Sequence, residues 1–151
     1  MNIEFNLKTK TYIGQASLLK IEDFLKENKY HKVGLIIDNA LKGNLFISEL
    51  KEKLDSSNKI SLTWYYDLPF EPDYVSLDEK KLLFKANNNS IVDVIIAIGG
   101  GSVIDFGKGI ATLITNNEPA LSYRGFPKGL NPSIPLIAVP TTAGTASEVT
   151  F

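Results

Sequence analysis

Three consecutive glycines between an apolar run and a helical pattern constrain this chain most strongly. Residues 94–98 are apolar and predict a buried strand, and residues 103–115 have the spacing of a helix. Gly99, Gly100 and Gly101 join the two without side chains, so that backbone N–H groups can approach an anion closely. The following helix adds the positive end of its dipole. The turn therefore predicts a phosphate or pyrophosphate site, although a tight structural turn would use the same residues.

Strands and helices alternate along the whole chain. Strands are predicted at residues 3–8, 33–37, 60–66, 94–98 and 136–139, and helices at residues 15–28, 45–54, 74–87 and 103–115. Several of these strands are continuous apolar runs, which is typical of strands that are buried on both faces. The pattern predicts one α/β layered domain with a mainly parallel sheet.

Three polar segments each follow a predicted strand. They are Asp38, the glycine turn and residues 141–147. In parallel sheets of this kind, ligands bind beyond the carboxyl ends of the strands. We therefore expect the three segments to form one ligand site at the same edge of the sheet.

The side chains of these segments have a functional and a structural interpretation. The Asp38 carboxylate could accept hydrogen bonds from a ribose, as acids at strand ends do in dinucleotide sites, or it could cap the next helix. Hydroxyl groups crowd the last segment, at Thr141, Thr142, Thr145 and Ser147. Hydroxyls suit phosphate or ribose binding, and they suit a hydrogen-bonded turn equally well.

Ser102 and Asp105 fit the capping pattern S-x-x-D at the start of a helix. In the structural interpretation, Ser102 caps the helix and Asp105 complements its dipole, which stabilises the helix by roughly 1 kcal/mol. In the functional interpretation, Ser102 contacts a phosphate and Asp105 lies at the rim of the cleft. The two interpretations are compatible.

The composition excludes several classes of function. A net charge of −1 gives no support for binding to nucleic acid or to an anionic membrane. The chain has no cysteine and one histidine, His31 in a predicted surface loop, which cannot build the usual nitrogen and sulfur site for zinc or iron. No apolar run is long enough to span a membrane, and no signal-peptide pattern begins the sequence, so we expect a cytoplasmic protein.

Two motifs together resemble the iron-containing (group III) alcohol dehydrogenase family. Residues 99–108 read GGGSVIDFGK and residues 140–150 read PTTAGTASEVT, where the family reads GGGSxxDxAK and PTTAGTGSEVT. Two departures are visible, Gly107 where alanine is usual and Ala146 where glycine is usual. The strand ending at Asp38 also looks like the family's first nucleotide-binding strand.

The resemblance implies that residues 1–151 form a Rossmann-like dinucleotide-binding domain, similar to the N-terminal domain of dehydroquinate synthase. The family's C-terminal helical domain supplies an aspartate and three histidines for a divalent metal, commonly iron or zinc. We therefore expect this chain to be the cofactor half of a longer protein, with no catalytic residue or metal ligand of its own and no activity alone. The implied reaction is hydride transfer between NAD(P) and an alcohol, aldehyde or ketone.

By the same resemblance, Gly99, Gly100, Gly101 and Ser102 hold the cofactor pyrophosphate. Thr141 and Thr142 line the phosphate and nicotinamide-ribose part, and Asp38 matches an acid that holds the adenosine ribose in members that prefer NAD to NADP. Asp105, Thr145 and Ser147 complete the expected cofactor site.

The expected partners are a small alcohol or aldehyde substrate and a second copy of the chain in a homodimer. Two alternatives stay open. One is a stand-alone, non-catalytic nucleotide-binding module, and the other is a relative of the glycerol dehydrogenase or dehydroquinate synthase type.

Overall fold

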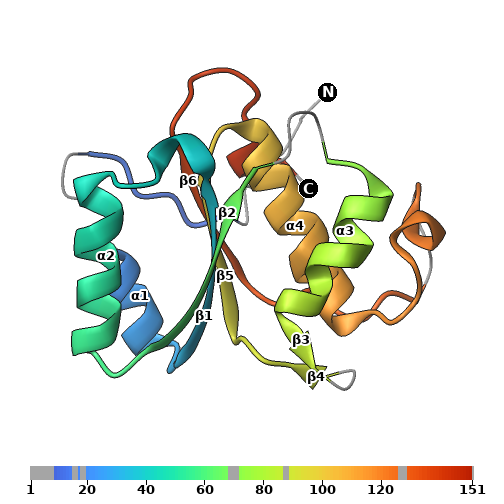
Figure 1. Ribbon diagram of the computed structural model, residues 1–151, viewed down its shortest axis with the longest axis horizontal. Coiled ribbons are helices and arrows are strands. Elements are labelled where there is room, and N and C mark those ends of the chain that lie inside the picture. Colours follow the sequence, from blue (N-terminus) through green and yellow to red (C-terminus); the bar gives the residue numbers. More distant parts are fainter. Residues whose placement is uncertain are drawn as a thin grey trace, which may run out of the picture.

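The centre of the fold is a four-stranded, fully parallel sheet with helices on both faces (Figure 1). The computed structural model describes residues 9–14, 17, 20–67, 72–86, 89–125 and 129–150. The strands follow the spatial order β2-β1-β5-β6, with bounds β1 Lys32–Asp38, β2 Ile60–Tyr66, β5 Val94–Gly99 and β6 Leu136–Pro140. The expected α/β layered domain with a parallel sheet is therefore confirmed.

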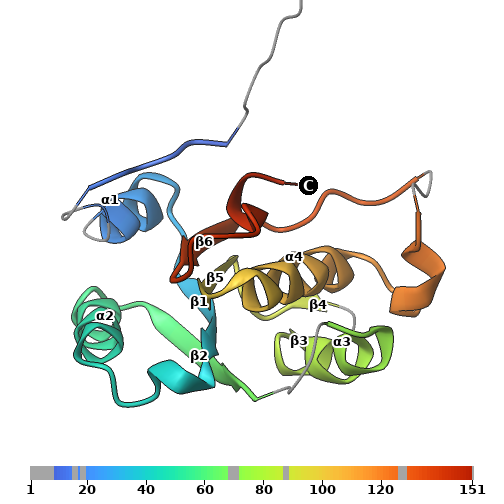
Figure 2. The same ribbon diagram turned by 90° about the horizontal axis from the view of Figure 1, so that it is seen from above.

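Helices cover both faces of the sheet, as Figure 2 shows from above. On one face lie α1 (Lys20–Glu27) and α2 (Leu45–Ser56), and on the other lie α3 (Tyr74–Lys80) and α4 (Gly101–Thr115). Short 3-10 helices and a two-stranded hairpin join these elements in the described part of the chain: η2 Asn39–Leu41, η3 Lys81–Leu83, η4 Ala120–Tyr123, η5 Ser147–Val149, and β3 Lys85–Ala86 with β4 Asn89–Ser90.

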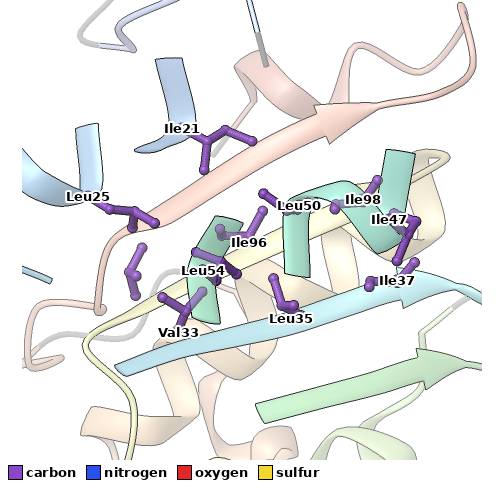
Figure 3. Packing of buried hydrophobic residues seen from close by; sticks show 11 residues of the cluster. Ile21, Leu25, Val33, Leu35, Ile37, Ile47, Leu50, Leu54, Ile96 and Ile98 are labelled. Carbon is purple, nitrogen blue, oxygen red and sulfur yellow. The ribbon is translucent and has the colours of Figure 1, made fainter. Parts of the chain in front are cut away.

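The two central strands supply both hydrophobic cores, because successive side chains of a strand point to opposite faces. Figure 3 shows Leu35 of β1 and Ile96 of β5 in the core under α1 and α2, together with Leu50 of α2. Ile36 and Ile95, the neighbours of the two strand residues, belong to the core under α4. This double burial explains why the central strands are continuous apolar runs rather than alternating ones.

The chain leaves the two central strands in opposite directions. After β1 it passes through α2 to the edge strand β2, and after β5 it passes through α4 to the other edge strand β6. The α2 and α4 helices lie on opposite faces of the sheet, so the connections that follow β1 and β5 diverge (Figure 2). A crevice outside the carboxyl ends of β1 and β5 is where open α/β sheets bind ligands.

Helix α4 packs closely on its neighbours at two glycines. A β-carbon added to Gly107 would lie 2.8 Å from the β-carbon of Ala97 in β5. One added to Gly109 would lie 2.6 Å from Cδ2 of Leu77 in α3. Each glycine costs about 1 kcal/mol in helix propensity relative to alanine, but it allows α4 to pack closely on its neighbours.

The helix predicted over residues 74–87 was wrong in its second half. Helix α3 ends at Lys80, and the chain continues through η3 into the short hairpin. Long-range contacts decide this, since Phe84 is buried against the sheet and the Lys85 ammonium donates to the Leu113 carbonyl near the end of α4. The predicted strand at residues 3–8 lies outside the described residues, as do residues 15, 16, 18 and 19 of the first predicted helix.

Candidate functional site

The three polar segments that follow strands meet at the carboxyl edge of the sheet. Asp38 ends β1, and the glycine turn of residues 99–102 joins β5 to α4. The second turn, residues 141–147, follows β6 and begins with a hydrogen bond from the Thr141 N–H group to the Gly99 carbonyl, at 2.9 Å. The structure thus brings the segments together as the strand pattern predicts.

Each glycine of the first turn faces a different neighbour. A β-carbon added to Gly99 would lie 2.7 Å from Cγ2 of Val103, and one added to Gly101 would lie 2.9 Å from Cγ2 of Thr145. The same atom on Gly100 would lie 3.3 Å from Oγ1 of Thr142. None of these glycines has a positive φ. Space, rather than an unusual backbone conformation, is what requires glycine at positions 99 and 101, whereas a β-carbon at position 100 would meet only the Thr142 side chain.

The N-terminus of α4 leaves two backbone donors unused. Helix α4 is 15 residues long, Gly100 is its N-cap, and no side chain caps it. The Gly100 carbonyl accepts the N–H groups of Val103 and Ile104, each at 3.1 Å. The N–H groups of Gly101 and Ser102 have no acceptor within the part of the chain that the structure describes. Such donors, at the positive end of the helix dipole, are suited to an anion.

The structure corrects one role predicted for Ser102. It lies at the second helical position instead of capping the helix, because α4 begins earlier, at Gly101. Its N–H group is one of the two unused donors, so the expected contact between Ser102 and a phosphate stays a prediction.

Asp38 caps the helix that follows β1, which is the structural one of its two interpretations. Its Oδ1 atom accepts the N–H group of Ala40 at 2.9 Å and so caps η2. The side chain is half-buried, and its second oxygen has no donor among the described residues. That oxygen lies at the end of the strand beside the glycine turn, so the expected contact with a ribose also stays a prediction.

Three of the predicted site residues bond one another in the described structure. The buried Ser147 hydroxyl lies 3.0 Å from Oδ2 of Asp105 and 2.9 Å from the hydroxyl oxygen of Thr145. The other carboxylate oxygen of Asp105 accepts the Lys108 ammonium at 3.2 Å. These bonds fasten the second turn to α4. From the sequence alone, Lys108 could be a surface lysine or a residue of the cleft, and the sequence does not reveal its bond to Asp105.

The remaining part of the second turn is open. Thr141, Thr142, Ala143 and Gly144 are exposed, and the hydroxyls of the two threonines have no partner in the described part of the chain. Thr142 lies beside Gly100, so its hydroxyl is close to the unused N–H donors. Glycines that leave room, free backbone donors and free hydroxyls are the chemical groups that fit a dinucleotide phosphate.

The side chains that the structure describes do not provide the ligand set of a metal ion. No group of three histidine, aspartate or glutamate side chains lies close enough to hold a metal ion among the described residues. We therefore assign no metal ligand to it. Within the same residues, no helix has the length and apolar character needed to cross a membrane.

A cavity of about 1150 Å³ lies beside the carboxyl edge rather than at the glycine turn. It follows β6 and is bounded by residues 9–14, by α1 and by residues 148–150. Pro140, Thr141, Lys108 and Thr150 line it, but none of residues 99–102 does, so we do not place the anion in it.

Residues 8–151 match the family model for iron-containing alcohol dehydrogenases. Lactaldehyde reductase of Escherichia coli K12 is 32% identical over 149 residues, which cover 96% of this chain and 37% of that protein. Alcohol dehydrogenase 4 of Saccharomyces cerevisiae is 29% identical over 146 residues, which cover 97% of this chain and 37% of that protein.

Solved structures show the same fold. The alcohol dehydrogenase from Oenococcus oeni has a TM-score of 0.77 and 30% identity, covering 90% of this chain and 35% of that one. The sulfoacetaldehyde reductase from Bifidobacterium kashiwanohense, solved in complex with NAD⁺, has a TM-score of 0.80 and 24% identity, covering 99% of this chain and 39% of that one. The chain spans less than two fifths of the length of these four relatives. Since the family match extends over nearly all its residues, the chain belongs to the iron-containing alcohol dehydrogenase family.

Proposed function

We propose that this chain is the dinucleotide-binding part of an NAD-dependent alcohol dehydrogenase. The whole enzyme interconverts a small alcohol and an aldehyde or ketone by hydride transfer. The observation that carries the proposal is the pair of unused N–H groups, on Gly101 and Ser102, at the N-terminus of α4. They lie at the carboxyl edge of the sheet, between Asp38 and the second turn.

The glycine turn binds the cofactor phosphates in this proposal. The N–H groups of Gly101 and Ser102 donate to phosphate oxygens, and the dipole of α4 favours the negative charge. Gly100 keeps the approach open, since a side chain there would occupy space next to Thr142. The Thr142 hydroxyl supplies a further donor from the second turn.

In this proposal, Asp38 binds the adenosine ribose and so distinguishes NAD from NADP. Its second carboxylate oxygen accepts from a ribose hydroxyl, while its charge repels the 2′-phosphate of NADP. When bound, the nicotinamide supplies the hydride acceptor, and the chain's own task is to hold and orient it.

The relatives support the reaction class. The sulfoacetaldehyde reductase was solved with NAD⁺, and the names of the other relatives describe reductases or dehydrogenases of small aldehydes and alcohols. A divalent metal, which the family name implies, would take its ligands from outside the described residues of this chain.

We also propose a homodimer, which light scattering on a dilution series tests.

Calorimetric titration with NAD tests the proposal. We expect saturable binding by the parent protein and loss of binding in Gly100→Val, whose side chain enters the space beside the unused donors. Gly109→Ala adds a side chain to the same helix far from the carboxyl edge and should bind NAD as the parent does. A folded Gly100→Val protein with parental affinity, or a folded parent protein that does not bind NAD, would contradict the proposal.

A further inference from the structure

The second turn is fixed at its two ends and free between them. At its start, the Thr141 N–H group donates to the Gly99 carbonyl. Residues 142–144 are exposed and make no hydrogen bond within the described chain. At its end, Ser147 is 3% exposed and donates to the Asp105 carboxylate. The placement of the whole turn over α4 therefore depends on the contacts of its last residues.

Lys108 holds those last residues from two directions. Its side chain is 20% exposed, and its ammonium group donates to Oδ1 of Asp105 at 3.2 Å and to the Thr150 hydroxyl at 2.8 Å. The Thr150 hydroxyl in turn donates to the Ser147 carbonyl at 3.3 Å. The bond to Asp105 thus fixes the carboxylate that binds the Ser147 side chain. The bond to Thr150 fixes the hydroxyl that binds the Ser147 backbone.

The position of Ser147 decides where Thr145 lies. The two hydroxyl oxygens are 2.9 Å apart, and Thr145 packs directly against Gly101, the first residue of α4. Between them, Ala146 has a left-handed backbone with φ of 53°. A non-glycine residue adopts this conformation at a cost, so the corner needs support from outside the turn.

We propose that Lys108 is a positioning residue for cofactor binding. Through Asp105 and Thr150 it keeps Ser147 on α4, and so it keeps the second turn closed over the unused N–H donors. The inference rests on the proposed function, because it assigns to Lys108 the geometry of a cofactor site and no contact with the cofactor itself.

A double-mutant cycle tests the proposal. Lys108→Met keeps an unbranched side chain, one atom shorter, and removes its donors, and Thr150→Val removes the matching hydroxyl at nearly constant shape. We expect each variant to raise the Kd for NAD by about 3- to 10-fold, the loss of one or two hydrogen bonds. The double variant should be no weaker than Lys108→Met, because both changes cut the same connection. Lys108→Arg should restore most of the affinity.

Amide hydrogen exchange of the cofactor-free protein separates positioning from general stability. Lys108→Met should speed exchange at the hydrogen-bonded amides of residues 141–150, including those of Thr141 and Val149, and leave the sheet amides unchanged, whereas a merely structural role would speed exchange throughout. Lys53→Met, which removes an exposed lysine of α2, is the matched control and should change neither exchange nor NAD affinity.

The outcomes are distinguishable. A parent protein without NAD affinity would overturn the proposed function, and with it the role of Lys108 in cofactor binding. NAD binding by the parent with unchanged affinity in Lys108→Met would overturn the positioning role alone. Unchanged exchange at residues 141–150 would show that Lys108 does not hold the turn, and additive losses in the cycle would show that it does not act through Thr150.

Discussion

Asp38 and Gly99 lie side by side at the carboxyl ends of β1 and β5. A β-carbon added to Gly99 would be 3.1 Å from the β-carbon of Asp38, which is a tight contact, so glycine lets the two strand ends lie close together. The contact puts an acid beside the turn that we propose to bind phosphate. In the proposed function, this one side chain decides the choice between NAD and NADP.

Asp38→Asn should shift the cofactor preference toward NADP. The amide has no charge to repel a 2′-phosphate and makes a weaker hydrogen bond to a 2′-hydroxyl. A charge-assisted hydrogen bond is worth about 1.5–3 kcal/mol, which corresponds to roughly a 10- to 100-fold change in the ratio of the two Kd values. Calorimetric titration with both cofactors measures the ratio.

Asp38→Ala provides the control for the capping role. Asparagine can still accept the Ala40 N–H group, so Asp38→Asn should unfold at nearly the parental urea concentration, whereas Asp38→Ala should lose about 1 kcal/mol. An unchanged cofactor ratio in Asp38→Asn would show that Asp38 is only a cap.

Ala146→Gly should stabilise the protein. The residue has a left-handed backbone, which costs an L-residue roughly 1–2 kcal/mol, and glycine adopts the same conformation freely. Because glycine also gains entropy in the unfolded state, we expect a net gain of about 0.5–1 kcal/mol in the free energy of unfolding. Urea titration measures it.

The same change at Ala143 is the matched control. Ala143 belongs to the same turn, is exposed as well, and does not have a positive φ. Ala143→Gly should therefore destabilise the protein by about 0.5–1 kcal/mol. Equal effects of the two substitutions would show that the left-handed backbone conformation of Ala146 does not destabilise the protein.

Alanine at Gly107 and at Gly109 of α4 should give different results. At Gly107 the new methyl would meet the fixed β-carbon of Ala97, and overpacking of this kind costs about 1–3 kcal/mol, more than the helix-propensity gain. At Gly109 the obstacle is the mobile end of Leu77, so the propensity gain of about 1 kcal/mol should offset it.

Thermal unfolding of both α4 variants measures the difference. The double variant Ala97→Gly Gly107→Ala should recover part of the loss, since it removes the colliding carbon. A Gly107→Ala protein as stable as the parent would mean that α4 can move away from β5 freely.

Asp93 gives a prediction for acid stability. Its carboxylate accepts the N–H groups of His31 and Lys32 at 2.8 and 2.9 Å, which ties the start of β1 to the segment before β5. Burial alone would raise the pKa of Asp93, but the two N–H donors and the charges of Lys32 and His31 lower it below the usual value. Asp93→Asn should cost about 1–2 kcal/mol at neutral pH.

The pH dependence follows from the sign of this shift. Because the pKa of Asp93 is lower in the folded than in the unfolded protein, its contribution is complete above the unfolded value of about 4. It is lost as the pH falls through the folded value. The stability difference between the parent and Asp93→Asn should therefore shrink in acid, and a difference that stays constant down to acid unfolding would contradict this assignment.

The strands and the place of the site could be predicted from the sequence. The bounds of β2 are those expected, and the predicted ranges of β1, β5 and β6 lie within the observed strands, because buried strands are continuous apolar runs. Parallel strands end at one edge, which places Asp38 beside the glycine turn. These inferences need only local pattern and topology.

Contacts between distant residues could not be predicted in this way. The burial of Phe84 and Lys85 overrides a helical pattern, and the bond between Lys108 and Thr150 joins positions 42 apart. The sequence also does not reveal that Gly101 makes room for Thr145, while Gly100 borders the open part of the second turn. The hydroxyl-rich composition of the second turn is the one signal that pointed to such bonds.

Amide NMR during titration with NAD tests the central claim most directly, because it observes the two donors themselves. We expect the Gly101 and Ser102 amide signals to move far more than those at the opposite edge of the sheet, and to saturate with the Kd measured by calorimetry. Shifts confined to residues around the cavity beside β6, with the Gly101 and Ser102 signals unmoved at saturation, would contradict the proposal that these N–H groups bind the cofactor phosphates.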